Sequence, residues 1–453
     1  MNLGGYSRDV DVLSGRYPVT SDHRRVGLLY GKGVLELVPP ESADVTVVRK
    51  PALPTLGDPA AAVREAFDRP VSSASLSVLA QGRTSACIVI CDITRPVPNQ
   101  LFLRPMVETL VRSGIPLGAI TILVANGLHR EGDAAEIAEI VSDPWVVDHV
   151  RVEGHRARDR ASLVDLGVTA TRGTPIVLNR LLVEADLRIV TGLVEPHFMA
   201  GWSGGRKVVA PGVAGEKTIR TFHSARFMED PLATQCNLAG NPLHEEQLEI
   251  VRRVGELYAL NTVVDEERQL SYVNFGEIEQ SHLDAVDFVA RFAAVDVPRR
   301  FHTVVTTAAG YPLDTTYYQT VKGMVTPVDI LAPGGTLIIA SECSEGLGSS
   351  DFRASQERLV DLGAEAFLAS VSAKPLADID EWQTEMQLKP MRLGQIQLYT
   401  TGLSPDELRL TGVEPVPSVH DAIVASMARH DDTGVAIIPE GPYVIPRYAA
   451  TGQ

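Results

Sequence analysis

The chain has 453 residues, of which 45% are hydrophobic and 22% charged. At about 150 residues per domain, this length predicts two or three domains, each able to bury its own core. Its 57 acidic residues against 41 Lys and Arg give a formal net charge of −16. This balance argues against a general nucleic-acid binder, because such proteins carry basic surfaces. Any anionic ligand must therefore be held by a few locally concentrated cations.

The cysteines and the apolar runs restrict the kind of protein further. Four cysteines without a C-x-x-C pair provide neither a disulfide framework nor a zinc ribbon. The first residues lack the basic and apolar regions of a signal peptide. The longest apolar stretches are well short of the ~20 residues that span a bilayer. We therefore expect a cytoplasmic protein with no membrane or nucleic-acid partner.

Short apolar runs alternate with segments of helical periodicity along the chain. The apolar runs predict strands over Val34–Val38, Val45–Val48, Ala86–Cys91, Ala119–Ala125, Leu187–Val194, His302–Thr307 and Thr336–Ala340. The helical segments are Pro59–Phe67, Gln100–Arg112 and His282–Ala294. Strands that alternate with helices indicate βαβ units, and nearly continuous apolar runs are typical of strands covered on both faces. The sequence therefore predicts an α/β fold with mainly parallel sheets.

A domain boundary is expected between the helix over His282–Ala294 and the strand that begins at His302. We place it within Val297–Arg300, which gives an N-terminal α/β domain over residues 1–297 and a C-terminal α/β domain over 298–430. The last segment, 431–453, contains a strand-like stretch interrupted by prolines. We expect this segment to return to the N-terminal domain.

Residues able to do chemistry gather directly after predicted strands, where ligands bind in open α/β sheets. The first group, Asp92, Thr94 and Arg95, follows the strand over Ala86–Cys91. A carboxylate, a hydroxyl and a guanidinium can orient a polar ligand, and Arg95 could bind a carboxylate through two hydrogen bonds. A strand-end turn with a solvent-exposed ion pair is the other interpretation of this group.

A second group ends in His129, shortly after the strand over Ala119–Ala125. A histidine here could act as a general base near neutral pH, although a single loop histidine is more often an ordinary surface residue. The third group is the richest, because residues 195–207 combine His197 with a serine, three glycines and two cations. The glycines allow the backbone to approach a ligand closely. A flexible turn followed by solvated cations is the structural alternative.

The glycine-rich run is not a nucleotide-binding loop of a familiar kind. Arg206 separates Gly205 from Lys207, and Val208 stands where a Walker A loop requires Ser or Thr. No G-x-G-x-x-G motif occurs in the chain either. Nucleoside-triphosphate and dinucleotide binding are therefore disfavoured.

Further candidates lie later in the chain. His223 on its own is interpreted as a structural histidine, and no H-E-x-x-H motif accompanies it. Tyr318 and Lys322 are spaced i and i+4, so on a helix they share one face and could hold a small carboxylate. An ordinary exposed helix face is the alternative. Because the candidate groups come from both domains, we expect the active site in the inter-domain cleft.

Together these motifs resemble the lactate racemase family, the nickel-pincer nucleotide enzymes. The resemblance rests on the D-x-T-R-P-x-P stretch from Asp92, on Gly127-Leu128-His129, and on the E-P-H…S-G-G-R-K run from Glu195 to Lys207. It continues through His223, the Tyr318-Gln319-x-x-Lys322 cluster and Trp382. These motifs follow the family's order and spacing over residues 92–382.

The resemblance implies a nickel-pincer nucleotide, a Ni(II) pyridinium-3-thioamide-5-thiocarboxylate mononucleotide, held mainly by the N-terminal domain. Lys207 would attach covalently to this cofactor, and His223 would be the protein's Ni²⁺ ligand. His129 and His197 would be the two acid/base histidines. The positions that match cofactor contacts are Asp92, Thr94, Ser203, Gly204 and Gly205, and those that match substrate contacts are Arg95, Tyr318, Gln319, Lys322 and Trp382.

The activity that the resemblance implies is a racemase that inverts C2 of a short aliphatic 2-hydroxy acid such as lactate. It would proceed by proton-coupled hydride transfer to the cofactor through a 2-keto acid intermediate. Proteins that synthesise the cofactor would be maturation partners. A bulky Trp382 in the pocket wall favours a short substituent, while relatives that act on malate, aromatic acids or sugar acids are the alternatives.

Interpretations from other classes use the same residues differently. A metal-dependent hydrolase would bind its metal through His129, His197 and His223, but Lys207 would then have no task. A lyase could use Lys207 as a Schiff-base nucleophile, but would not need three histidines. A non-catalytic carboxylate-binding protein could use the cations and Tyr318 alone. Only the cofactor hypothesis predicts both nickel and a chromophore in the loaded protein.

Overall fold

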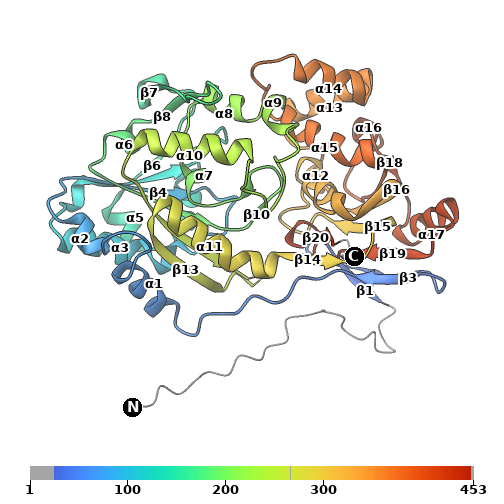
Figure 1. Ribbon diagram of the computed structural model, residues 1–453, viewed down its shortest axis with the longest axis horizontal. Helices are drawn as coiled ribbons and strands as arrows, with labels where there is room; N and C mark the ends of the chain where they lie inside the picture. The colour runs from blue at the N-terminus through green and yellow to red at the C-terminus, as the bar shows by residue number, and fades with distance from the viewer. Residues whose placement is uncertain (1–24, 266, 450–453) are drawn as a thin grey trace, which may run out of the picture.

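The computed structural model describes residues 25–265 and 267–449. Two six-stranded sheets, each accompanied by helices, form its two halves. Figure 1 shows the first half, coloured blue to yellow, beside the second half, which is coloured orange to red apart from blue strands near the start of the described chain. This arrangement confirms the predicted α/β class with mainly parallel sheets.

The first sheet has the strand order β13–β12–β9–β4–β5–β6. Its members are β4 (Ala86–Cys91), β5 (Ile120–Ala125), β6 (Arg151–Gly154), β9 (Leu187–Leu193), β12 (Tyr258–Val264) and β13 (Leu270–Glu277). All neighbours are parallel except β12 and β13, which pair antiparallel. The strands β4 and β9 lie at the centre and are almost wholly buried, as their continuous apolar sequences predict.

Helices connect these strands and begin where the sequence supplies caps. They are α1 (Pro59–Asp68), α2 (Leu76–Ala80), α3 (Leu103–Arg112), α4 (Ala134–Val141), α5 (Pro144–His149), α6 (Arg180–Glu184), α7 (Arg206–Val209), α8 (Glu216–Phe222), α9 (Ala225–Met228), α10 (Pro242–Val254) and α11 (Ile278–Ala293). Asp58 before α1 and Asn241 before α10 each accept backbone N–H groups and are followed by proline. Two short antiparallel pairs are β7 (Leu163–Val168) with β8 (Pro175–Asn179), and β10 (Pro196–His197) with β11 (Gly201–Trp202).

The second sheet has the order β18–β17–β16–β15–β19–β3 and is parallel throughout. Its strands are β3 (Asp44–Val47), β15 (Phe301–Thr307), β16 (Leu331–Ala340), β17 (Gln395–Tyr399), β18 (Glu414–Pro415) and β19 (Gly434–Ile437). Its helices are α12 (Tyr317–Val325), α13 (Ser350–Leu362), α14 (Ala364–Ser372), α15 (Glu381–Leu393), α16 (Pro405–Leu410) and α17 (Val419–His430). The residues 318 and 322 therefore do lie on a helix, as their spacing predicts.

Both ends of the described chain lie with the second sheet, which differs from the expected division. The sequence predicts that residues 431–453 return to the N-terminal domain, whereas β19 lies between β15 and β3. All of β19 is buried, and such a strand needs a neighbour on each side. β20 (Ile445–Tyr448) pairs with β14 (Ala294–Val297), and the hairpin of β1 (Val26–Tyr30) and β2 (Gly33–Leu37) packs on the same half. Residues 1–24 and 450–453 of these segments lie outside the described part.

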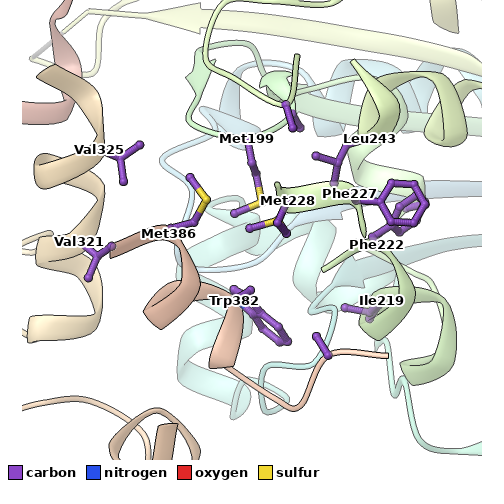
Figure 2. Packing of buried hydrophobic residues seen from close by; sticks show 14 of the residues in the cluster. Met199, Ile219, Phe222, Phe227, Met228, Leu243, Val321, Val325, Trp382 and Met386 are labelled. Carbon is purple, nitrogen blue, oxygen red and sulfur yellow. The ribbon is translucent and has the colours of Figure 1, made fainter. Parts of the chain in front are cut away.

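A buried apolar cluster runs through both halves and fixes their contact. Figure 2 shows side chains of the first half, Met199, Ile219, Phe222 and Met228, together with Val321, Trp382 and Met386 of the second. Close packing of this kind resists displacement, because interiors are filled to crystal-like density. The helices α12 and α15 are therefore held near α8 and α9, and with them the side chains that these elements carry.

All four cysteines are free thiols, which agrees with the expected lack of a disulfide framework. Within residues 25–265 and 267–449, no helix combines the length and the apolar character needed to cross a membrane.

Candidate active site

Three neighbouring strands of the first sheet end at the candidate site. The strand order here is β9–β4–β5. After β4, the chain first adds β5 on one side of β4 and later adds β9 on the other side. Open α/β sheets bind ligands at such a switch point, beyond the carboxyl ends of the strands. Asp92 follows β4 directly, while His129 follows β5 and His197 follows β9. The three motifs found in the sequence therefore share one edge of the sheet.

His129 and Asp92 form a hydrogen-bonded pair between two of these loops. Nδ1 of His129 lies 2.7 Å from Oδ2 of Asp92, and Oδ1 of Asp92 accepts from the Thr94 hydroxyl at 2.6 Å. The carboxylate is buried, whereas 65% of the His129 side chain is exposed. The hydrogen bond to Asp92 is the main cause that raises the pKa of His129 above its ordinary 6.5. Since the carboxylate holds Nδ1–H, Nε2 carries a free lone pair and can accept a proton.

His197 has the opposite hydrogen-bonding arrangement. Its Nδ1 accepts the backbone N–H groups of Met199 at 3.3 Å and Ala200 at 3.2 Å, so the neutral ring carries its proton on Nε2. Burial, followed by the positive charge of Lys207, lowers the pKa of His197 well below 6.5. His197 is therefore a neutral hydrogen-bond donor in this conformation, whereas His129 is an acceptor.

A buried arginine fixes the glycine-rich loop that follows β11. Arg206 is 1% exposed, and its guanidinium donates to the carbonyls of Ala200 at 3.1 Å and Trp202 at 3.3 Å. Its Nη1 also lies 2.9 Å from Nε2 of His282. The alternative interpretation of this run, a flexible turn followed by solvated cations, would leave Arg206 in solvent. The structure instead places it beneath the loop, where its guanidinium cross-links two carbonyls of the loop.

Two positions in this loop require glycine. Gly204 has a φ of +82°, and a Cβ there would lie 2.7 Å from the side chain of Val194. Gly205 has a φ of +48°, which residues with a Cβ rarely adopt. The hydroxyl of Ser203 donates to the carbonyl of Glu195 at 3.2 Å. The loop therefore doubles back closely on the end of β9.

Lys207 follows the loop in the first turn of α7 and is half-buried. Burial, and after it the charges of Arg95 and Arg206, lowers the pKa of Lys207 to about 7. Lys322 of the second half contributes to the same shift. A large share of the amine is therefore neutral near pH 7 and able to act as a nucleophile.

His223 lies at the end of α8 beside the second half. Its Nδ1–H donates to the carbonyl of Ile219 at 2.8 Å, which leaves the lone pair on Nε2. Burial lowers the pKa of His223 to about 4, so the ring is neutral at neutral pH. Its centroid lies 4.5 Å from that of Trp382. A neutral imidazole with a fixed tautomer is the form that binds metal ions.

The second half brings α12 to the site. The indole N–H of Trp382 donates to the hydroxyl of Tyr318 at 3.2 Å, so a phenol and an indole lie together. Burial lowers the pKa of Lys322 to about 8, and the charge of Arg95 adds to the effect. Oε1 of Gln319 is buried and has no hydrogen-bond partner among the described residues. A polar ligand with a donor group could satisfy it.

Arg95 forms an ion pair with Glu195. The two side chains come from the loops after β4 and β9, so the pair bridges the switch point. Although burial acts against it, the charge of Glu195 raises the pKa of Arg95. From the sequence, Arg95 is predicted to bind the carboxylate of the substrate, and no role is predicted for Glu195.

Asp380 is a second residue that the sequence analysis missed. It precedes α15 with a φ of +61°, and its charge acts on His129 from the second half, although more weakly than Asp92. Burial raises the pKa of Asp380. Its position two residues before Trp382 is the one signal in the sequence that could have drawn attention to it.

The predicted site residues thus form local groups whose charges act on one another across the two halves. A cleft between the halves stays a prediction. Within the described part of the chain, no group of three or more His, Cys, Asp or Glu is placed to hold a metal ion. The three-histidine site that a metal-dependent hydrolase would need is therefore not formed by these residues.

Comparisons with known proteins match both halves. A model of the lactate racemase N-terminal domain matches residues 30–235, and a model of the lactate racemase C-terminal domain matches residues 298–445. A lactate racemase from Lactiplantibacillus plantarum is 31% identical over 387 residues, which are 84% of this chain and 90% of the relative. A lactate racemase from Thermoanaerobacterium thermosaccharolyticum is 28% identical over 396 residues, 85% of this chain and 90% of the relative.

Solved structures share the fold. The lactate racemase apoprotein from Thermoanaerobacterium thermosaccharolyticum superposes with a TM-score of 0.85 at 26% identity, covering 93% of this chain and all of that one. A protein from Thermotoga maritima has a TM-score of 0.63 at 18% identity over 83% of this chain and 96% of its own, which shows a common fold alone. With both domain models matched in order, and relatives alike over most of their length, the chain is an isomerase that belongs to the lactate racemase family.

Proposed function

We propose that this enzyme racemises a short aliphatic 2-hydroxy acid, with lactate as the leading candidate, using a nickel-pincer nucleotide. The observation that carries the proposal is the pair of histidines with opposite hydrogen bonding, His129 and His197, near a partly neutral Lys207 and a neutral His223. Both relatives described above are lactate racemases, which supports lactate as the substrate. Maturation by cofactor-synthesis proteins in the cytoplasm belongs to the same proposal.

His223 fits the task of the nickel ligand. Its Nδ1–H is engaged by the carbonyl of Ile219, so the tautomer with a free Nε2 is fixed. The lowered pKa keeps protons from competing with a metal for that lone pair. Imidazole is a donor that suits nickel, and the neighbouring ring of Trp382 limits how far the imidazole can turn.

Lys207 and the glycine-rich loop fit covalent attachment of the cofactor. About half of the amine is neutral near pH 7. A Cβ on Gly204 or Gly205 would meet Val194 or His282, so glycine at both positions lets the loop fold back closely on the protein and present Lys207 beyond β9.

Both carboxylate oxygens of Asp92 already accept hydrogen bonds, one from Thr94 and the other from His129. We therefore assign Asp92 to the support of His129, and the cofactor contacts of Asp92 and Thr94 stay predictions.

The side chains of the protein bind the substrate and move its hydroxyl proton. When bound, the cofactor supplies the acceptor for the hydride that leaves C2. His129 takes the hydroxyl proton at Nε2, and Asp92 stabilises the imidazolium that results. Arg95 and Lys322 hold the substrate carboxylate, the former with two parallel N–H donors. Loss of hydride avoids placing a second negative charge beside that carboxylate.

Inversion requires a proton donor for the other face of the oxidised substrate. A 2-keto acid held by its carboxylate end can turn its carbonyl group, and the imidazolium form of His197 would then give the hydroxyl proton from Nε2. In both directions Nδ1 of His197 must carry a proton while Nε2 gives or takes one, so Nδ1 must release the N–H groups of Met199 and Ala200. The bulky ring of Trp382, 7% exposed and hydrogen-bonded to Tyr318, favours a short C2 substituent.

Deuterium at C2 tests this function. We expect the holoenzyme, produced with the cofactor-synthesis proteins, to convert C2-deuterated L-lactate in ordinary water into D-lactate that keeps most of its label. Hydride transfer keeps the label because a carbon-bound hydride exchanges slowly with water, whereas an imidazolium proton exchanges quickly. Mass spectrometry of the separated enantiomers at early conversion measures the retention.

The Lys207→Ala variant is the matched control, because it keeps both histidines but lacks the amine for attachment. It should racemise little lactate and carry little nickel. Near-complete loss of the label from D-lactate would contradict hydride transfer. Racemisation of another hydroxy acid, with lactate untouched, would contradict the substrate part of the proposal alone.

A further inference from the structure

The cations expected to hold the substrate carboxylate already face carboxylates of the protein. Arg95 forms an ion pair with Glu195, and Asp92 is a further negative charge that acts on it. Lys322 approaches from the second half, and Glu195 and Asp92 oppose the lowering of its pKa by burial and by Arg95. Glu195 is therefore a carboxylate whose charge acts on both cations.

Two cations and two carboxylates leave this group close to neutral. Both oxygens of Asp92 accept hydrogen bonds, from His129 and from Thr94. Proton transfer at His129 therefore depends on Asp92. Glu195 has no such partner among the reacting groups, and its side chain is 29% exposed. The charge of Glu195 therefore affects mainly how strongly Arg95 and Lys322 can attract a negatively charged substrate.

The backbone keeps Glu195 at this place. Its carbonyl accepts the backbone N–H of Ser203 at 2.9 Å and the Ser203 hydroxyl at 3.2 Å. These bonds tie the end of β9 to the glycine-rich loop, so the carboxylate cannot withdraw far when a substrate arrives. A substrate with one carboxylate can share Arg95 with Glu195. A second substrate carboxylate would add a like charge near Glu195, which is unfavourable.

We propose that Glu195 is a specificity-determining residue, because its pairing with Arg95 makes the site prefer 2-hydroxy acids with one carboxylate over those with two. This inference rests on the proposed function. Glu195 acts through Arg95, so it is a positioning residue rather than a catalytic one. It concerns the selection of the substrate and not the chemistry at C2.

The Glu195→Gln variant removes the charge and keeps the shape. We expect kcat/KM for a 2-hydroxy dicarboxylate such as malate, relative to lactate, to rise about tenfold, because one negative charge fewer favours a dianion more than a monoanion. The change should lie mainly in KM and should shrink with added salt, since the ion pair is partly exposed. Glu195→Asp, which keeps the charge, should keep the wild-type preference. Glu184→Gln, which breaks an exposed pair with Arg180, is the matched control and should change neither value.

Two measurements separate this inference from the proposed function. Racemisation of lactate by the wild-type holoenzyme tests the proposed function. The malate-to-lactate ratio tests Glu195, and a ratio in Glu195→Gln within about twofold of the wild type overturns the inference. If that variant turns over neither acid, calorimetric titration of the holoprotein with each acid decides, because binding needs no turnover. A shift of the two dissociation constants toward malate supports the inference, and an unchanged ratio overturns it.

Discussion

The hydrogen bond between His129 and Asp92 sets the pH range in which His129 can take a proton. It raises the pKa of His129 above 6.5, so the ring loses its free lone pair at a higher pH than an ordinary histidine would. We expect kcat/KM to fall as the pH drops through this raised pKa. We also expect it to fall above about pH 8, where Lys322 loses its charge and holds the substrate carboxylate less tightly.

The Asp92→Asn variant should move mainly the acidic limb, because the neutral amide no longer favours the protonated ring. That limb should shift to lower pH, and kcat/KM should drop roughly 100-fold as the ring loses its orientation and its charge partner. The alkaline limb should move less, since the charge of Asp92 contributes only weakly to the pKa of Lys322. Initial rates of racemisation across the neutral range measure both limbs, and the expected result is a larger shift of the acidic limb than of the alkaline one. An acidic limb at its wild-type position would show that another group limits the rate.

Local motifs explain why most of the candidate side chains could be named before the fold was known. His129, His197 and Lys207 each lie in a short run whose residue types carry the chemistry. The pair of Arg95 and Glu195 could not be predicted in this way, because 100 residues separate the two in the chain. Their contact depends on β4 lying next to β9, and strand order is not encoded in either motif.

The glycine-rich loop is the element on which attachment of the cofactor depends. In Gly204→Ala the new Cβ would lie 2.7 Å from Val194 and 3.2 Å from the carbonyl oxygen of Leu193, at a φ of +82°. We expect this variant to lose roughly 1–3 kcal/mol of stability. The loop must also shift, so the nickel content and the adduct mass on Lys207 should both fall. Metal analysis and peptide mass spectrometry measure these two quantities.

Gly82→Ala is the matched control for this loop. Gly82 has a similar φ of +73°, and nothing lies within 4 Å of its missing Cβ. This variant should therefore show the backbone strain but keep its nickel and its adduct. Full nickel and a full adduct in Gly204→Ala would mean that the loop does not need to approach the cofactor closely.

The ends of the helices and strands show which limits can be predicted from an element's own residues. The predicted strand over Ala86–Cys91 has the same limits as β4, since an apolar run between polar ends determines a buried strand. The predicted helix from His282 in fact begins at Ile278, because the Glu277 side chain accepts the N–H groups of Glu279 and Gln280. Such a cap is less common with Glu than with Ser or Asp and was not expected.

The buried cluster shared by the two halves predicts that the molecule unfolds as one cooperative unit. Met386 of α15 is fully buried in the cluster that also holds Met199 and Met228 of the first half, as Figure 2 shows. We expect Met386→Ala to lower the free energy of unfolding by about 2–5 kcal/mol, because it leaves a cavity. Both halves should still unfold in one transition.

Urea titration followed by tryptophan fluorescence and by circular dichroism measures the midpoint and the cooperativity together. Val424→Ala is the control, since Val424 of α17 is 45% exposed and should cost within about 0.5 kcal/mol. Two separated transitions in Met386→Ala or in the wild type would show that the halves are independent. The sequence could not predict this coupling, because each methionine looks like ordinary core in its own segment.

The place of β3 in the second sheet has a consequence for the order in which the protein is made. β3 is synthesised early, but β19, its neighbour in the sheet, is among the last strands to leave the ribosome. The strands from β4 to β13 follow one another without that delay, and domains generally fold as units during synthesis. The sheet of the half with Lys207 and His223 can therefore form while the half with Tyr318 and Lys322 still lacks its final strand, and the buried cluster that joins the halves closes only afterwards. Under the proposed function, this interval gives the maturation proteins open access to the lysine before translation ends.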